Sequence, residues 1–156
     1  MKRVIAITMI FVGAAALTNV ATADDVEDIK KATVEHFATL NAGNVAAHIE
    51  HHLAGHTTFG GDGGLLLVND SLEEEKKSLQ ADVDAGLKQN LQLTHLEVKV
   101  YGNTAVVTGY VVGTVTTPDG KTTQVMNRRT AVLIKQSNKW KEVHVHSSPV
   151  ETAQSE

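Results

Sequence analysis

Two histidines alternate with two valines near the end of the chain, in the stretch WKEVHVHSS that covers residues 140–148. If this stretch is a β-strand, His144 and His146 lie on one face and the valines on the other, because side chains alternate along a strand. Imidazole titrates near neutral pH, so either histidine could take a proton from a substrate carbon as a general base. The pair is therefore the first candidate for a catalytic or binding site.

Carboxylate bases are scarce at positions that should face a core. Enolisation chemistry needs a carboxylate in apolar surroundings, together with hydrogen-bond donors for the developing oxyanion. Glu142 is the best acidic candidate, since it shares strand parity with Trp140 and both histidines, whereas Glu97 is expected to face water. The sequence therefore favours binding or histidine-based chemistry, and Glu142 stays as the third catalytic candidate beside His144 and His146.

Two further side chains could complete a site on the strands. Arg129 could hold an anion or a carbonyl oxygen, and Tyr110 could donate its hydroxyl. The alternative is that Arg129 and the two histidines form a polar patch on the outer face of the sheet. Trp140 favours the inward assignment for His144 and His146, because a lone tryptophan is usually largely buried.

A second group of histidines lies in the first half of the chain, at positions 48, 51, 52 and 56. His48 and His52 stand one helical turn apart, a spacing found among metal ligands. No Glu-x-x-His frame surrounds them, and a hydrated helix edge is the expected arrangement. We therefore expect no metal and no other cofactor, with His48 and His52 as the candidates if a metal does bind.

The elements that must hold these side chains follow from the spacing of apolar residues. Helices are predicted over residues 24–41 and 45–52, and Ser71 with Glu74 forms a capping box for a third helix that ends near residue 88. After residue 90, four runs rich in valine and threonine alternate with the turn signals YGN, PDG and SN. Helices followed by an antiparallel meander predict an α+β fold with the sheet curled over the helices.

The first 23 residues have the order of a secretory signal peptide. Lys2 and Arg3 are followed by an apolar run over residues 4–20 and by Ala-Thr-Ala at residues 21–23. An uncleaved membrane anchor is the alternative, because the apolar run approaches the length of a membrane span. We expect export to a periplasm or beyond, one domain over residues 24–150, a flexible tail over residues 151–156, and no membrane contact after cleavage.

Charge and composition exclude several classes of partner. The chain has a formal net charge of −4, and removal of Lys2 and Arg3 with the signal segment would make it −6. That balance argues against nucleic acid and against anionic membrane surfaces. The absence of cysteine excludes thiol nucleophiles, thiolate metal sites and disulfides, so the hydrophobic core alone must stabilise an exported domain of this size.

Several strings in this chain resemble the nuclear transport factor 2-like superfamily, which includes ketosteroid isomerase, scytalone dehydratase and the SnoaL-like polyketide cyclases. The matching strings are LNAGN, FGGDGGLL, VYGNTAVVTGYV, RRTAVLIKQ and WKEVHVHSS, in this order over about residues 26–148. The resemblance implies a cone of three helices and a curved, mainly antiparallel sheet, with a mostly apolar pocket at its open end. It also implies that Phe59 and the glycines after it run along the pocket mouth, although a plain connecting turn is the alternative.

Three functions remain open at this point. The preferred one is an exported SnoaL-like protein, a homodimer, that binds a small hydrophobic molecule through Phe59, Tyr110, Arg129, His144 and His146, without necessarily catalysing a reaction. The second is a lyase or isomerase of the ketosteroid isomerase or scytalone dehydratase type with a histidine base. The third is a homodimeric assembly module built through the sheet. Fold alone does not separate them.

Overall fold

The computed structural model of the protein describes residues 23–150. The expected signal peptide lies outside this range, apart from Ala23, and so does the tail from residue 151. None of the helices in the described range is long and apolar enough to cross a membrane.

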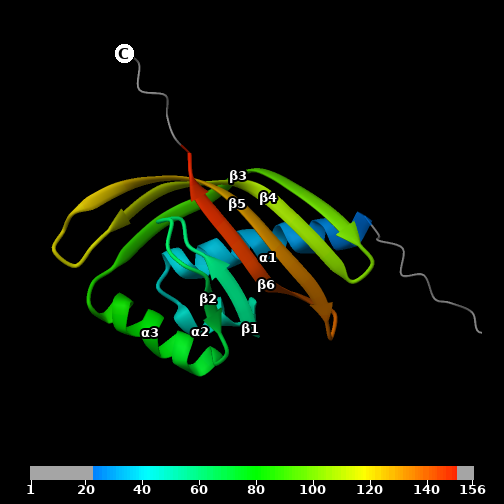
Figure 1. Ribbon diagram of the computed structural model, residues 1–156, viewed down its shortest axis with the longest axis horizontal. Coiled ribbons are helices and arrows are strands. Elements are labelled where there is room, and N and C mark those ends of the chain that lie inside the picture. Colours follow the sequence, from blue (N-terminus) through cyan, green and yellow to red (C-terminus); the bar gives the residue numbers. More distant parts are fainter. Residues whose placement is uncertain (1–22, 151–156) are drawn as a thin grey trace, which may run out of the picture.

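Helices precede most of the sheet, as the sequence predicts. The described chain forms α1 (Ala23–Asn41), α2 (Val45–Ile49), β1 (His52–Phe59), β2 (Leu67–Asn69), α3 (Leu72–Asp84), β3 (Lys88–Tyr101), β4 (Thr104–Thr116), β5 (Thr122–Gln136) and β6 (Lys139–Pro149). The strands make one sheet in the order β2-β1-β6-β5-β4-β3, which arches over α1, with α2 and α3 towards one end (Figure 1). The predicted α+β fold with a curved, mainly antiparallel sheet is confirmed.

The four long strands form the predicted meander. β3 pairs with β4, β4 with β5, and β5 with β6, all antiparallel. β1 adds to the other side of β6 as a parallel neighbour, and β2 pairs antiparallel with β1. This parallel pairing joins segments more than 80 residues apart in the sequence, and it brings the first histidine group next to the last strand.

The core lies between α1 and the concave face of the sheet. Ile29 is completely buried, and Thr33 and Phe37 continue its stripe at helical spacing. Burying a side chain the size of Ile29 stabilises the fold by about 1.5–3 kcal/mol. The sheet contributes small and branched side chains and one tryptophan to the same core: Ala105, Val107, Ala131, Leu133, Trp140 and Val145.

Asparagine and serine side chains fix the ends of the helices. At the end of α1, the side chain of Asn41 both donates to the carbonyl oxygen of Leu91 and accepts from its amide, each at 2.8 Å, which ties the helix to β3. Asn44 caps α2, and Ser71 caps α3 by accepting from the amide of Glu74 at 3.3 Å. The predicted start of α3 is confirmed, and the helix ends at Asp84.

α2 is shorter than the sequence predicts. It ends at Ile49, and the chain has already entered β1 at His52. Its buried residues are Val45, His48 and Ile49, whereas Ala46 is exposed.

A β-bulge in β6 changes which of its residues face the core. Leu133 pairs with Glu142, but the next residue back along β5, Val132, pairs with His144, so one extra residue of β6 is accommodated between them. Trp140 and Glu142 therefore face inward before the bulge, and Val145 faces inward after it. The prediction that His144 and His146 share a face with Trp140 and Glu142 is wrong, because it assumed unbroken alternation.

Candidate functional site

A cavity of about 370 Å³ lies between the helices, β1, β2 and the inner face of β5 and β6. Its apolar wall is formed by Phe37, Leu40, Leu79 and Val145. The polar wall carries four histidines, two carboxylates and one guanidinium: His36, His48, His52, His56, Glu75, Glu142 and Arg129. The register shifts of β1 and β6 both fall beside this wall, between His52 and Thr57 and between Glu142 and His144. Bulges are common next to functional sites because they redirect side chains.

The innermost charged pair is Arg129 with Glu142. Nη2 of Arg129 donates to both carboxylate oxygens of Glu142, at 2.6 and 2.7 Å, and only 3% of Glu142 is exposed. The guanidinium also lies over the ring of Phe37, 5.4 Å from its centroid. Burial acts to raise the pKa of Glu142, but Arg129 and then His36 outweigh it and hold that pKa well below its usual value.

His36 comes from α1 and lies between Glu142 and the other histidines. Its Nδ1 is 3.2 Å from Oε1 of Glu142, close enough for an ion-pair contact but without the alignment of a hydrogen bond. Its Nε2 is 3.3 Å from Nε2 of His52. Burial lowers the pKa of His36, and the nearby Glu142 opposes that shift without reversing it.

His52 and His56 share one carboxylate on α3. Nδ1 of His52 donates to Oε1 of Glu75 at 3.0 Å, and Nε2 of His56 lies 3.4 Å from the same oxygen. Partial burial would raise the pKa of Glu75, but hydrogen bonds from the two histidines lower it to about 2. Burial likewise acts to lower the pKa of His56, but its contacts with Glu75 prevail and raise it.

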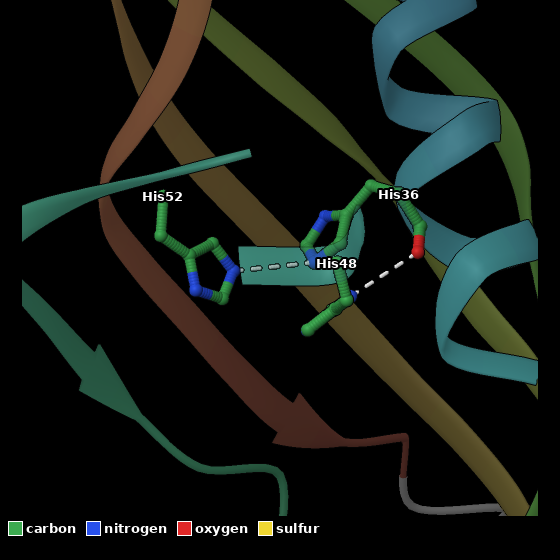
Figure 2. A group of neighbouring side chains, drawn as sticks. All are labelled: His36, His48 and His52. Carbon is green, nitrogen blue, oxygen red and sulfur yellow. Dashed lines mark hydrogen bonds between the residues drawn. The ribbon is translucent and has the colours of Figure 1, made fainter. Parts of the chain in front are cut away.

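His48 completes the cluster from α2. Its Nδ1 donates to the backbone carbonyl oxygen of His36 at 3.3 Å, and its ring centroid lies 4.3 Å from that of His36 and 4.9 Å from that of His52 (Figure 2). Burial lowers the pKa of His48 to about 3, and the charges that His36 and His52 can carry add to this effect. The ring is therefore neutral at pH 7.

Comparison with known proteins gives the chain a family. Residues 4–151 match the family described as the calcium/calmodulin dependent protein kinase II association domain. This chain belongs to that association domain family. None of the curated proteins compared with the chain matches it.

Solved structures show the same fold as this association domain at low sequence identity. A candidate association domain of the same kinase family from Xanthomonas campestris is 21% identical, with a TM-score of 0.64 over 94% of this chain and 100% of that one. A ketosteroid isomerase-like protein from Erwinia carotovora atroseptica is 16% identical, with a TM-score of 0.67 over 84% and 100%. A candidate dehydratase of the NTF2-like family from Streptomyces avermitilis is 20% identical, with a TM-score of 0.69 over 83% and 98%. The resemblance to the nuclear transport factor 2-like superfamily is confirmed, and it extends to the fold alone.

The association domain brings only part of the predicted site together. Arg129 and Glu142 line the cavity, as do His48 and His52, the two metal candidates. His144, His146 and Phe59 meet one another away from it: the Phe59 ring is 6.1 Å from that of His144 and 5.4 Å from that of His146. Tyr110 is 39% exposed and pairs across the ladder with Arg128 rather than with a cavity residue.

The structure of the association domain also differs from the expectations for the first histidine group and for Glu142. His48 and His52 are buried rather than arranged along a hydrated helix edge, and His52 lies on a strand. Glu142 is an inward-facing carboxylate, although no convincing one was expected from the sequence.

His36 and Glu75 were not among the predicted site residues, although the spacing of each carries a signal. His36 falls on the buried stripe of α1 with Ile29 and Thr33, and Glu75 stands between Leu72 and Leu79 on one face of α3. A polar residue on the apolar face of an amphipathic helix indicates a buried partner.

Proposed function

We propose that this association domain binds a small, largely apolar molecule with one polar group in the cavity beside the histidines. The observation that carries the proposal is the division of the cavity into an apolar wall with Phe37 and Leu79 and a polar wall with His52, His56 and Asn69. A volume of about 370 Å³ falls in the lower part of the range for small-molecule sites. The apolar wall supplies affinity, and the polar wall orients the ligand.

The charges of the cavity favour a neutral or cationic ligand over an anion. Arg129 is already engaged by Glu142, and Glu75 leaves one negative charge in excess on the wall when the histidines are neutral. Both carboxylates are ionised and held by partners, which makes them weak bases. Binding therefore has more support than carboxylate-based isomerisation, and a proton-transfer role would fall to His52 or His56 rather than to His144 or His146.

Narrowing the cavity should weaken the binding of a neutral probe. Ser78 lines the cavity from an exposed position on α3, so the ring of Ser78→Phe would narrow the cavity, whereas the adjacent Lys77, also exposed, lines a groove elsewhere. We expect saturable, one-to-one binding of 1-aminoanthracene, measured by fluorescence, that weakens at least tenfold in Ser78→Phe. Lys77→Phe is the matched control and should bind as the unsubstituted chain does. Equal binding by both variants would place the probe elsewhere and refute the proposal.

We also propose a homodimer formed through the outer face of the sheet. Tyr110 and Met126, 39% and 48% exposed, lie on this face together with half-buried valines of β4 and β5. A one-sided sheet with apolar residues on its open face is typical of an interaction surface. Membership in a family described as an association domain supports the same function.

A charge on that face should separate the two copies. We expect a dimer at micromolar concentration by light scattering, and a monomer for Met126→Lys. Leu66→Lys is the control, because Leu66 is exposed on the segment before β2, away from the sheet face. A dimer that survives Met126→Lys and dissociates with Leu66→Lys would show that the edge segment, not the sheet face, is the interface.

Export of the mature domain is a further proposal, supported by the order of the basic start, apolar run and Ala-Thr-Ala. Intact mass of protein recovered from an exporting host should begin within a residue or two of Asp24. Full-length protein in the membrane fraction would contradict it.

A further inference from the structure

The Nδ1 atoms of three buried histidines point to acceptors outside the cluster. Nδ1 of His52 donates to Glu75, Nδ1 of His48 donates to the carbonyl oxygen of His36, and Nδ1 of His36 is 3.2 Å from a carboxylate oxygen of Glu142. Carbonyl and carboxylate oxygens only accept, so Nδ1 of His52 and Nδ1 of His48 carry the proton, and the carboxylate of Glu142 beside Nδ1 of His36 favours a proton there as well. A neutral ring in this tautomer has its lone pair on Nε2.

Two of these lone pairs face each other. The Nε2 atoms of His36 and His52 are 3.3 Å apart, which is within hydrogen-bonding distance. With the proton of each neutral ring on Nδ1, the two Nε2 lone pairs repel at that distance unless a proton or a cation lies between them. Two imidazole nitrogens bound at 2.0–2.1 Å to one tetrahedral ion are themselves separated by about 3.3–3.4 Å. The observed distance, which also suits an N–H···N hydrogen bond, therefore fits a pair of ligands on one ion.

The third ring lies within reach of the same point. Ligand nitrogens of His36, His48 and His52 are all within 4.8 Å of one another, so small side-chain rotations bring them onto a single ion. Figure 2 shows the three side chains converging from α1, α2 and the start of β1. All three residues are buried, and burial keeps His36 and His48 neutral, which is the form that binds metal.

The surroundings of the rings match the outer shell of metal sites. Ligating histidines usually donate their second nitrogen to a carboxylate or a backbone carbonyl, which orients the ring and raises its basicity. Glu75 and the carbonyl of His36 do this for His52 and His48, and Glu142 lies beside His36. The carboxylate of Glu75, which accepts from Nδ1 of His52, also attracts a cation.

A second set of ligands, His52 with His56 and Glu75, is less suitable. Nδ1 of His56 already donates to the carbonyl oxygen of Leu53 at 3.0 Å, and its Nε2 lies 2.9 Å from the side-chain nitrogen of Asn69. Glu75 is held by both histidines. The Nε2 lone pair of His56 is therefore already engaged by Asn69 and is not free to bind an ion.

We propose that His36, His48 and His52 bind one divalent transition-metal ion, with Zn²⁺ as the first choice. Three imidazoles leave one position of a tetrahedral site open, and because all three residues line the cavity, that position faces it. An open position is the arrangement of a zinc site that binds water or a ligand group, not of a closed structural site. The proposal does not depend on the small molecule proposed above.

The test is metal binding by the EDTA-treated and dialysed protein, with no organic ligand present. Titration with Zn²⁺ in a calorimeter should give one site per chain with a dissociation constant in the micromolar range or below. Co²⁺ should give the intense visible absorption of a tetrahedral complex, and Zn²⁺ should raise the melting temperature. Failure to observe saturable one-to-one binding would overturn the proposal, whatever the result with 1-aminoanthracene in the presence of EDTA.

Variants decide whether the binding is at this cluster. His48→Asn keeps a donor for the carbonyl of His36 but removes the ligand, and it should weaken Zn²⁺ binding at least a hundredfold. Glu75→Gln, on a helix without buried residues, should weaken binding 10- to 100-fold through loss of the carboxylate partner of His52, even if His48→Asn fails to fold. His146→Ala is the control at an exposed histidine and should bind normally. Unchanged affinity in Glu75→Gln, or loss only in His146→Ala, would assign the metal to the surface.

Discussion

Replacement of Arg129 by methionine should lower the free energy of unfolding by about 3–5 kcal/mol at pH 8, because it leaves the buried carboxylate of Glu142 without its cation. For a domain of this size the melting temperature should fall by roughly 10–20 °C. The loss should be smaller at pH 5, because a carboxylate deprived of its partner in a buried site takes up a proton more readily. Urea unfolding followed by circular dichroism at the two pH values measures both effects.

The double variant Arg129→Met with Glu142→Leu distinguishes the destabilisation caused by an unpaired buried charge from that caused by lost packing. With both charges gone, most of the stability should return, since an apolar pair of similar volume is often as stable as a buried ion pair. Tyr101→Met, at a residue that is 63% exposed, is a control that should cost less than about 0.5 kcal/mol. A loss below about 1 kcal/mol in Arg129→Met, equal at both pH values, would contradict the role assigned to this pair.

Acid should unfold the protein at a higher pH than carboxylate protonation alone would require. Burial lowers the pKa values of His36, His48 and His51 in the folded state, with that of His48 at about 3. The unfolded chain takes up these protons near pH 6.5, so the stability from the neutral rings is complete above that pH and is lost as pH falls. For His48 this contributes a slope of about 1.4 kcal/mol per pH unit from pH 6.5 down towards its folded-state pKa of about 3. His56 does not add to this loss, because its raised pKa keeps it protonated in the folded state as well.

The quantity to measure is the slope of the free energy of unfolding against pH. It should be measured with EDTA present, so that bound metal does not contribute. His48→Asn removes one titrating ring, and its slope between about pH 6.5 and pH 4.5 should fall by close to one proton. His95→Asn, which removes an exposed imidazole outside the cluster, is the matched control. A His48→Asn protein with an unchanged slope would show that His48 is not held neutral in the folded state.

The sequence predicts the fold well because the decisive signals are local. Alternation and turn residues define β3 to β6, the stripe from Ile29 to Phe37 defines α1, and Ser71 marks the start of α3. No local sequence pattern predicts the parallel pairing of β1 with β6, because this pairing depends on how the preceding helices direct the chain in space. The length of α2 is likewise decided by this tertiary pairing rather than by its own composition.

The candidate site is predicted less well, and for two physical reasons. One extra residue in β6 places every later side chain on the face opposite to the one that simple alternation predicts. His144 and His146 therefore point away from the cavity, whereas Glu142, before the extra residue, points into it. The polar cluster is also assembled from α1, α2, β1 and α3, and residues so far apart in sequence show no common spacing. Arg129 lines the cavity because the extra residue lies in β6, so β5 keeps its own alternation from the buried Leu133 and Ala131 to Arg129.

The bulge also sets how the last strand tolerates insertions and deletions. Insertion or deletion of one residue within a strand ordinarily moves every later side chain of that strand to the opposite face of the sheet. Such changes are therefore tolerated mainly in loops. In β6 the extra residue at Val143 means that a chain lacking it would have regular alternation, with Glu142 and Val145 facing inward as they do now. Relatives one residue shorter at this point would keep the same cavity, so a gap inside the strand is the correct way to align them with this chain. A gap moved to a neighbouring turn would instead match cavity residues of one protein with surface residues of the other.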